Sequence, residues 1–175
     1  RRRPSSPPVG PLAIAPDGSL YVADSSNNRV RRVSLDGIIT TVAGTGSGTN
    51  ADGIPATPAL LSVPIGIALA PDGTLYIADT GHHRVRSVGA DGIIQALACS
   101  GTPGFDGEGG ASTIAKCNQV KGVTITPDRR VLVADTLTHR VRHVAPPFPG
   151  IVASNIVIPA GDGRELYGFD CFGRH

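Results

Sequence analysis

The sequence predicts an all-β protein built from repeated four-stranded antiparallel units, and three observations support this fold class. One pattern occurs three times, and the aspartates that end its central run, Asp24, Asp79 and Asp135, stand about 55 residues apart. Turn residues separate short β-forming runs within every copy. The 175 residues include 23 Gly and 15 Pro, and only 4 % are aromatic. This composition favours short strands joined by tight turns over long amphipathic helices.

In the first copy, each expected strand ends at a recognisable turn. Pro16-Asp17-Gly18 predicts a tight turn, because Pro fixes φ and Gly accepts a positive φ. Residues 12–15 are short and uniformly apolar, as expected for a strand buried on both faces. Residues 29–33 alternate charged and apolar side chains, which is typical of a half-exposed strand. The four strands are expected at 12–15, 19–23, 29–33 and 38–43.

Four antiparallel strands per repeat form one blade of a β-propeller. We expect blades at about 9–46, 64–99 and 120–158, preceded by a disordered linker at 1–8. The fourth strand of the third copy is degenerate, because the prolines of 146–149 interrupt it. Three blades plus a partial fourth make an incomplete propeller, since closure takes about four to eight blades. Either further blades complete the ring or the open edges associate.

Two long glycine-rich connections, 44–64 and 100–120, separate the copies. Loops of this length without strand signals are often functional, although tolerance of insertions explains them equally well. Cys99 and Cys117 flank the second connection and predict either a disulfide, if the protein is exported, or two small buried thiols. Loss of such a disulfide is expected to loosen residues 100–116 without unfolding the blades.

Net charge and hydropathy argue against two classes of function. A formal net charge of +2 is too small to indicate nucleic-acid binding on its own. No run approaches the roughly 18 consecutive apolar residues of a membrane helix. Residues 1–8 are rich in Arg and Pro and do not resemble a secretory signal. The chain contains no Met and is interpreted as a piece of a longer protein.

The repeated pattern is Pro-Asp-Gly, a strand ending in Ala-Asp, and then Asn or His before Arg-Val-Arg. It stands at 16–33, 71–88 and 127–144, and in this respect the chain resembles the NHL-repeat family of β-propellers. Arg129-Arg130 departs from the family pattern and predicts a looser third turn. Residues 159–175 contain Glu-Leu-Tyr, Phe-Asp and Gly-Arg-His and resemble the start of a YD-repeat segment, as in Rhs and teneurin-like proteins. A partial blade is the other interpretation of this tail.

The repeated aspartates and arginines have two interpretations. A ring of charged groups suits catalysis or ligand binding, whereas in a structural role each Asp accepts turn hydrogen bonds and pairs with the Arg that opens the next strand. We favour the structural role, because every copy carries the pair and an active site normally comes from one departing blade. The pairs are Asp24 with Arg29, Asp79 with Arg84 and Asp135 with Arg140.

A second arginine set aligns on successive copies and comprises Arg31 with its neighbour Arg32, Arg86 and Arg142. Some NHL propellers bind RNA through a basic face, so the resemblance makes this set a candidate RNA-binding stripe. The small net charge and the scarcity of aromatic residues favour a solvated strand face instead.

Histidines and loop carboxylates are the candidate metal ligands. A propeller lyase similar to this family holds zinc with channel histidines, but His82, His83 and His139 are expected in turns that face solvent. Asp106 and Glu108 offer oxygens for Ca²⁺, although loop solubility explains them equally well. We assign no catalytic, cofactor-binding or metal-binding residue.

The sequence therefore predicts a non-enzymatic module without a cofactor. Its expected role is recognition of a protein or carbohydrate, or packing, within a large secreted or cell-surface protein of the Rhs or teneurin-like kind. Its partners would be that ligand and the remaining blades or shell of the parent protein; no membrane segment is expected, and nucleic acid is not favoured as a partner. A metal-dependent propeller lyase or lactonase and an RNA-binding propeller are the alternatives. The candidate binding surface comprises Arg31, Arg86, Arg142, Asp106 and Glu108.

Overall fold

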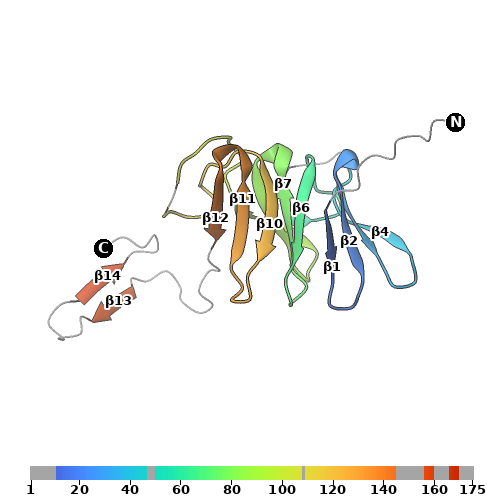
Figure 1. The fold of residues 1–175 in the computed structure, drawn as a ribbon, viewed down its shortest axis with the longest axis horizontal. Helices are drawn as coiled ribbons and strands as arrows, with labels where there is room; N and C mark the ends of the chain where they lie inside the picture. Colours follow the sequence, from blue (N-terminus) through green and yellow to red (C-terminus); the bar gives the residue numbers. More distant parts are fainter. Residues whose placement is uncertain (1–10, 47–49, 108, 145–155, 160–165, 170–175) are drawn as a thin grey trace.

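The computed structural model of the chain describes residues 11–46, 50–107, 109–144, 156–159 and 166–169. These residues form β-strands, turns and three short 3-10 helices, and the described ranges contain no α-helix. All strand pairs in the four sheets are antiparallel. The predicted all-β class and the incomplete propeller are therefore confirmed (Figure 1). The expected linker at 1–8 lies outside the described residues.

Blade 1 is a four-stranded sheet in the order β1-β2-β3-β4. Its turns follow the chemistry of the sequence: Gly18 has a φ of 84° and donates its N–H to the Ala15 carbonyl at 2.8 Å. The 3-10 helix Ser25–Asn27 then leads from β2 to β3. The four strands are β1 (Leu12–Ile14), β2 (Leu20–Asp24), β3 (Arg29–Val33) and β4 (Ile39–Ala43).

Blade 2 contains five strands, one more than the sequence predicts. Its own four strands are joined at the outer edge by β5 (Ile54–Pro55), which pairs with β9. Because β5 comes from the chain between the blades, that stretch is not a structureless loop. We call residues 44–63 connection 1 and residues 99–119 connection 2. The other strands are β6 (Pro64–Leu69), β7 (Leu75–Asp79), β8 (Arg84–Val88) and β9 (Ile93–Ala98), with a 3-10 helix at Thr80–His82.

Blade 3 shows three strands in the described residues, in the order β10-β11-β12. Its expected fourth strand falls in 145–155, outside the described residues. A separate two-stranded sheet pairs β13 (Ile156–Pro159) with β14 (Leu166–Phe169), so the expected boundary at residue 158 falls inside β13. The strands of blade 3 are β10 (Val120–Ile125), β11 (Val131–Asp135) and β12 (Arg140–Val144), with a 3-10 helix at Thr136–Thr138.

The third Pro-Asp turn is as tightly closed as the first two, although a looser turn was expected. Arg129 takes the place of Gly18 and Gly73 and adopts their left-handed conformation, with a φ of 64°. It donates its N–H to the Thr126 carbonyl at 2.9 Å, as the glycines do to their equivalents. The hydrogen bond therefore holds the turn, and the strain falls on the arginine backbone.

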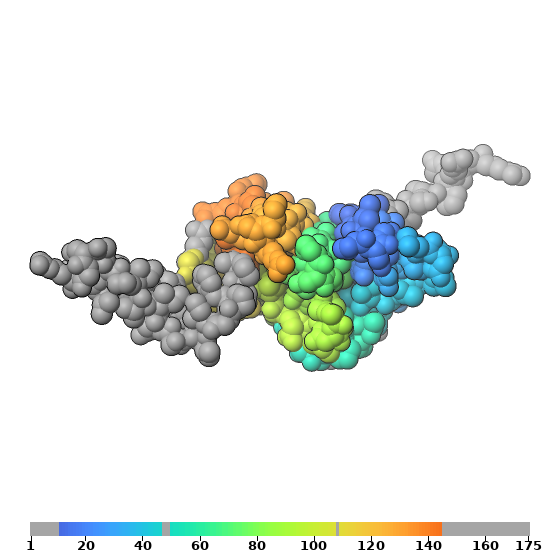
Figure 2. All heavy atoms as spheres, turned by 90° about the horizontal axis from the view of Figure 1, so that it is seen from below, coloured from blue at the N-terminus to red at the C-terminus, as the bar shows by residue number. Residues whose placement is uncertain are grey.

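Two apolar clusters form the core, one at each junction between blades. Each cluster combines one face of a blade, buried residues of the connection and the facing side of the next blade. The blades therefore pack side by side, and in Figure 2 β6 (green) lies between blade 1 (blue) and blade 3 (orange). The first cluster includes Ala23, Val30, Ala56, Leu61, Ile77 and Ile94, and the second includes Ala78, Val85, Cys117, Val123, Val133 and Val144.

The innermost strands of blades 2 and 3 approach each other through glycine. A Cβ on Gly66 of β6 would stand 2.7 Å from the Lys121 carbonyl oxygen and 2.9 Å from the Gly122 Cα in β10. Backbone atoms cannot yield in the way a flexible side chain does. Gly66 is therefore required by the distance between the two blades.

The two end blades each leave one apolar face open. Leu12 and Ile14 are exposed, so β1 is buried on one face only and the prediction of burial on both faces is wrong in this chain. At the other end, Val141 is 72 % exposed, whereas Val85 at the same position of blade 2 is fully buried. The difference arises because Val85 is covered by blade 3.

None of the helices in the described residues is both long and apolar enough to cross a membrane.

Candidate functional site

The largest buried charged side chain in the described residues is Arg86, on β8. Its side chain is 0 % exposed. One guanidinium nitrogen lies 2.9 Å from a carboxylate oxygen of Asp52, and the other lies 3.7 Å from Asp79. The same group donates to the side-chain oxygen of Asn50 and the carbonyl of Ala51. Because three of these partners belong to connection 1, Arg86 fixes the connection to blade 2.

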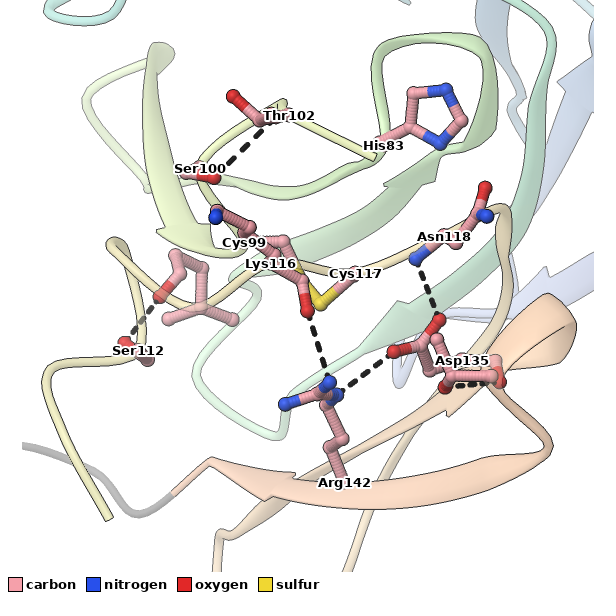
Figure 3. The surroundings of a disulfide bond; sticks show 12 residues. His83, Cys99, Ser100, Thr102, Ser112, Lys116, Cys117, Asn118, Asp135 and Arg142 are labelled. Atoms are coloured by element: carbon pink, nitrogen blue, oxygen red, sulfur yellow. Dashed lines mark hydrogen bonds and ion pairs between the residues drawn. A yellow bond between two sulfur atoms is a disulfide. The ribbon is translucent and has the colours of Figure 1, made fainter. Parts of the chain in front are cut away.

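Blade 3 repeats this arrangement with a different set of partners (Figure 3). Arg142 on β12 donates from Nε to Asp135 at 2.8 Å and from a terminal nitrogen to the Lys116 carbonyl at 2.9 Å. The other oxygen of the fully buried Asp135 accepts the backbone N–H of Asn118 at 2.7 Å. The aspartate thus links the third strand of its blade to the end of connection 2.

The aspartates pair differently from the sequence prediction. Asp79 and Asp135 contact Arg86 and Arg142, which lie two residues beyond the expected partners Arg84 and Arg140. Diagonal neighbours across an antiparallel pair are within reach of a long side chain, which makes this contact possible. In blade 1, Asp24 instead accepts two hydrogen bonds from the side-chain amide of Asn27.

The arginines that open the third strands reach the connections. Arg29 donates to the Thr45 carbonyl at 3.0 Å, and Arg84 donates to the Ser100 carbonyl at 3.1 Å. Arg84 also lies 3.6 Å from Asp52. Each of these arginines therefore holds the first residues of the connection that leaves its own blade.

The arginine set at 31, 86 and 142 does not form a solvated strand face. Arg86 is fully buried and Arg142 is largely buried in an ion pair with Asp135. Arg31 is half-buried, and its Nε has no hydrogen-bond partner within the described residues. The three arginines therefore do not form a stripe of exposed cations suited to RNA, because Arg86 and Arg142 are directed at the connections.

Hydrogen bonds between blades use residues that the sequence patterns did not single out. The hydroxyl of Ser25 donates to the Pro64 carbonyl, and the hydroxyl of Thr80 donates to the Val120 carbonyl at 2.6 Å. Each hydroxyl belongs to the residue that directly follows the recurring aspartate, and it reaches the first residue of the next inner strand. An equivalent Ser or Thr at 25, 80 and 136 is the signal that would have identified them.

Asn28 and His83 each contact the last residue of the connection that leads to the next blade. The Asn28 side-chain oxygen accepts the N–H of Val63 at 2.7 Å, and His83 Nδ1 accepts the N–H of Gln119 at 3.1 Å. Both residues are half-buried, so the expectation that His83 faces solvent is wrong. His82 is also half-buried and lies 2.9 Å from Asp79.

The histidines and acids do not converge on a metal position. Within the residues that the structure describes, no group of three His, Cys, Asp or Glu side chains has a geometry that could hold an ion. His139 and His143 are exposed on blade 3. Glu108 and His175 lie outside the described residues.

The structure joins Cys99 and Cys117 in a disulfide, with their Cα atoms 5.6 Å apart (Figure 3). Both cysteines are buried in the second apolar cluster. The bond closes connection 2 at its two ends, next to the Asp135 and Arg142 contacts. Residues 100–116 are therefore held at the point where they leave and re-enter the blades.

The outer part of connection 2 carries an exposed aromatic ring together with exposed charged groups. Phe105 is exposed, and the guanidinium of Arg140 lies 3.8 Å from the centre of its ring. Lys116 lies 3.7 Å from the exposed carboxylate of Asp106. An aromatic ring beside separate positive and negative groups can stack on and hydrogen-bond to a ligand.

Aspartates in the hairpin turns have lowered pKa values, and hydrogen bonds are the cause. The hydroxyl of Ser19 lowers the pKa of Asp17, and the backbone N–H of Thr74 lowers the pKa of Asp72. Side-chain hydroxyls likewise lower the pKa of Asp36 and Asp128, from Ser34 and Thr126 respectively. These carboxylates stabilise turns and stand apart from the buried aspartate contacts.

Comparison with known proteins identifies the repeat. The pattern that defines the NHL repeat matches residues 10–33 and 61–86. Teneurin-m of Drosophila melanogaster is 33 % identical and human Teneurin-4 is 31 % identical, each over 94 % of this chain. The chain spans only 7 % of the length of these curated relatives.

Solved structures show the same fold at lower sequence identity. A structural genomics protein of unknown function from Bacteroides thetaiotaomicron superimposes with a TM-score of 0.66 at 22 % identity. The match covers 75 % of this chain and 34 % of that protein. At this identity the similarity shows the fold alone.

Proposed function

The chain belongs to the NHL-repeat proteins and is related to the teneurins, and on this basis we propose that it is a non-enzymatic module of a larger secreted or cell-surface protein. Its blades pack against their neighbours in that protein. They also hold a connecting segment in a fixed position for recognition of a protein or carbohydrate ligand.

The observation that supports this proposal best is the burial of Arg86. A fully buried cation with Asp52 and Asp79 as partners is suited to fixing a connection on a blade. A catalytic or RNA-binding arginine would need contact with a substrate. The repeated charged residues therefore support a role in assembly.

Recognition is assigned to the exposed surface of connection 2. The disulfide fixes both ends of this segment, and Arg140 supports the Phe105 ring. A preorganised segment loses little conformational entropy when it binds a partner. Aromatic and arginine side chains are also the residues that contribute most to binding free energy at interfaces.

The test is binding of the purified chain to an array of glycans and to a library of purified extracellular domains. Phe105→Ser is expected to weaken a specific interaction by roughly tenfold or more. Leu35→Ser is the matched control, because Leu35 is also an exposed apolar residue but lies in blade 1. Equal loss in both variants would contradict a binding surface on connection 2.

Elemental analysis of the dialysed protein tests the alternative of a metal-dependent lyase or lactonase. The proposed module contains zinc or calcium at well below one ion per chain. One ion per chain would overturn the proposal and make His82, His83 and His139 the first residues to substitute.

A further inference from the structure

The outer edges of blades 1 and 2 differ in one respect. In blade 2, β5 of connection 1 pairs with β9 and makes a fifth strand. The N–H of Gly53 donates to the Ile94 carbonyl, and the N–H of Ala56 donates to the Gly92 carbonyl, both at 2.8 Å. In blade 1, the equivalent strand β4 is the last of its sheet within the described residues.

The side chains beneath that edge differ in the same way. Ile94 of β9 is 0 % exposed, whereas Ile39, its equivalent in β4, is 56 % exposed. Ile54 pairs directly with Ile94, so connection 1 covers this position in blade 2. Ile39 is thus an apolar residue at a position that is otherwise fully buried.

Arg31 gives an independent indication at the same place. It occupies in blade 1 the position of Arg86, which binds a carboxylate, an amide oxygen and a carbonyl of connection 1. Within the described residues the side chain of Arg31 has neither a hydrogen bond nor an ion pair, whereas the terminal nitrogens of Arg86 have both. A half-buried guanidinium whose side chain has no ion pair favours a nearby carboxylate.

We propose that the outer edge of blade 1 is a docking site for an acidic, glycine-rich segment of the same kind as connection 1. The segment adds a short strand to β4, covers Ile39 and places a carboxylate on Arg31. Its source is the connection that enters blade 1 from a preceding blade of the parent protein.

The spacing along the chain specifies where this carboxylate stands. Asp52 precedes Arg86 by 34 residues, and Glu108 precedes Arg142 by the same number. The position 34 residues before Arg31 lies outside this sequence. An Asp or Glu is therefore expected there, followed by Gly as in Asp52-Gly53 and Glu108-Gly109.

A graft tests the docking site directly. Residues 1–8 are replaced by a copy of residues 44–63, which is joined directly to Val9. In this graft the copy of Asp52 precedes Arg31 by 34 residues, the same spacing as between Asp52 and Arg86. The graft is possible because connection 1 makes its strand pair and its Arg86 contacts with the blade that follows it. The control is the same graft with the copied aspartate changed to Asn.

The grafted chain is expected to show slower hydrogen exchange at the β4 amides and a folded-to-unfolded ratio roughly tenfold or more above that of the chain lacking residues 1–8. Much of this gain should disappear in the Asn control and in a grafted Arg31→Met variant. A graft that carries both the Asn substitution and Arg31→Met should lose no more stability than either change alone, because both changes remove the same contact.

Two results would overturn the proposal. One is a graft that changes neither β4 exchange nor the unfolding equilibrium. The other is dimerisation of the ungrafted chain that Arg31→Glu abolishes, which would make a second copy of the chain the occupant. Neither result bears on ligand binding by connection 2, so the proposed function is tested separately.

Discussion

Leu61 in connection 1 occupies the place that Cys117 occupies in connection 2. Each residue is fully buried and directly precedes the residue whose N–H donates to the blade aspartate, Ser62 to Asp79 or Asn118 to Asp135. The partner across the connection is Gly44 in one case and Cys99 in the other, both with positive φ. A disulfide and an apolar contact are thus alternative ways of closing the same connection.

We expect Cys99→Ala with Cys117→Ala to lower the free energy of unfolding by about 3 kcal/mol, because the bond closes a loop of moderate length. Cys99→Gly with Cys117→Leu should recover part of the loss, since a buried leucine contributes about 1.5–3 kcal/mol. Urea unfolding of the three proteins measures both effects. Equal stability of the two double variants would show that the connections are not interchangeable.

Breaking the buried charge cluster should be costly. Asp79→Ala leaves Arg86 with Asp52 as its one carboxylate and leaves the N–H of Ser62 without its acceptor, and we expect a loss of about 1–3 kcal/mol in the free energy of unfolding. The control is Arg130→Ala, which breaks the exposed contact with Asp128 and should cost less than about 1 kcal/mol. Denaturant titration distinguishes the two, and similar losses would argue against a special role for the buried cluster.

Gly66→Ala should separate blades 2 and 3. The added Cβ meets backbone atoms of β10, so the strands must move apart, at an expected cost of about 1–3 kcal/mol. Thermal unfolding provides the measurement. Gly110→Ala is the control, since its nearest non-neighbouring atom is 3.6 Å from the new Cβ and the midpoint should hardly change.

Arg129→Gly should stabilise the chain. A non-glycine residue pays about 1–2 kcal/mol in the left-handed region, and the greater freedom of glycine in the unfolded chain offsets part of this gain. A net increase of up to about 1 kcal/mol in the free energy of unfolding is expected. Gly73→Arg is the reciprocal change and should lower stability; a gain in that variant would contradict the explanation.

Acid should weaken the hairpin turns. The backbone N–H of Thr74 holds the pKa of Asp72 below its value in the unfolded chain, so the folded state binds protons less readily. The contribution is present above the unfolded pKa of about 4 and is lost as pH falls through the folded pKa. The difference in stability between the natural chain and Asp72→Asn should therefore shrink below about pH 4. A constant difference from pH 7 to pH 2 would show that the charge is not involved.

The turns and strands of the blades were predictable because their determinants are local. Pro-Asp-Gly, Asp-Gly and alternating Arg-Val-Arg fix short segments within each repeat. The partner of Asp79 could not be predicted from the sequence. Arg84 and Arg86 both project from β8, and only the path of connection 1 determines which of them contacts Asp79. β5 was missed for a similar reason: two residues, Ile54 and Pro55, carry no periodicity and become a strand only beside β9.

The burial of the arginines also depends on contacts distant in sequence. Arg31, Arg86 and Arg142 look equivalent in the repeat, yet Arg86 is enclosed and Arg31 is half-exposed. Arg86 is enclosed by residues 50–52, which lie about 34 residues upstream, whereas Arg142 is held by Asp135 and the Lys116 carbonyl. Internal alignment of the connections would have shown Asp52 and Glu108 as counterparts, which is the one signal that the sequence offered.

Because β5 and the Arg86 contacts attach connection 1 to the blade that follows it, the unit that can be copied or removed intact begins at a connection and ends with the outer strand of a blade. A gene duplication with breakpoints at residues 44 and 98 would carry a complete set of matching contacts. Breakpoints at the start of an inner strand would deliver a blade without the segment that covers its edge. When such a propeller gains blades during evolution, the duplicated unit is therefore expected to begin with the acidic connection and to end with the outer strand of the blade that follows it.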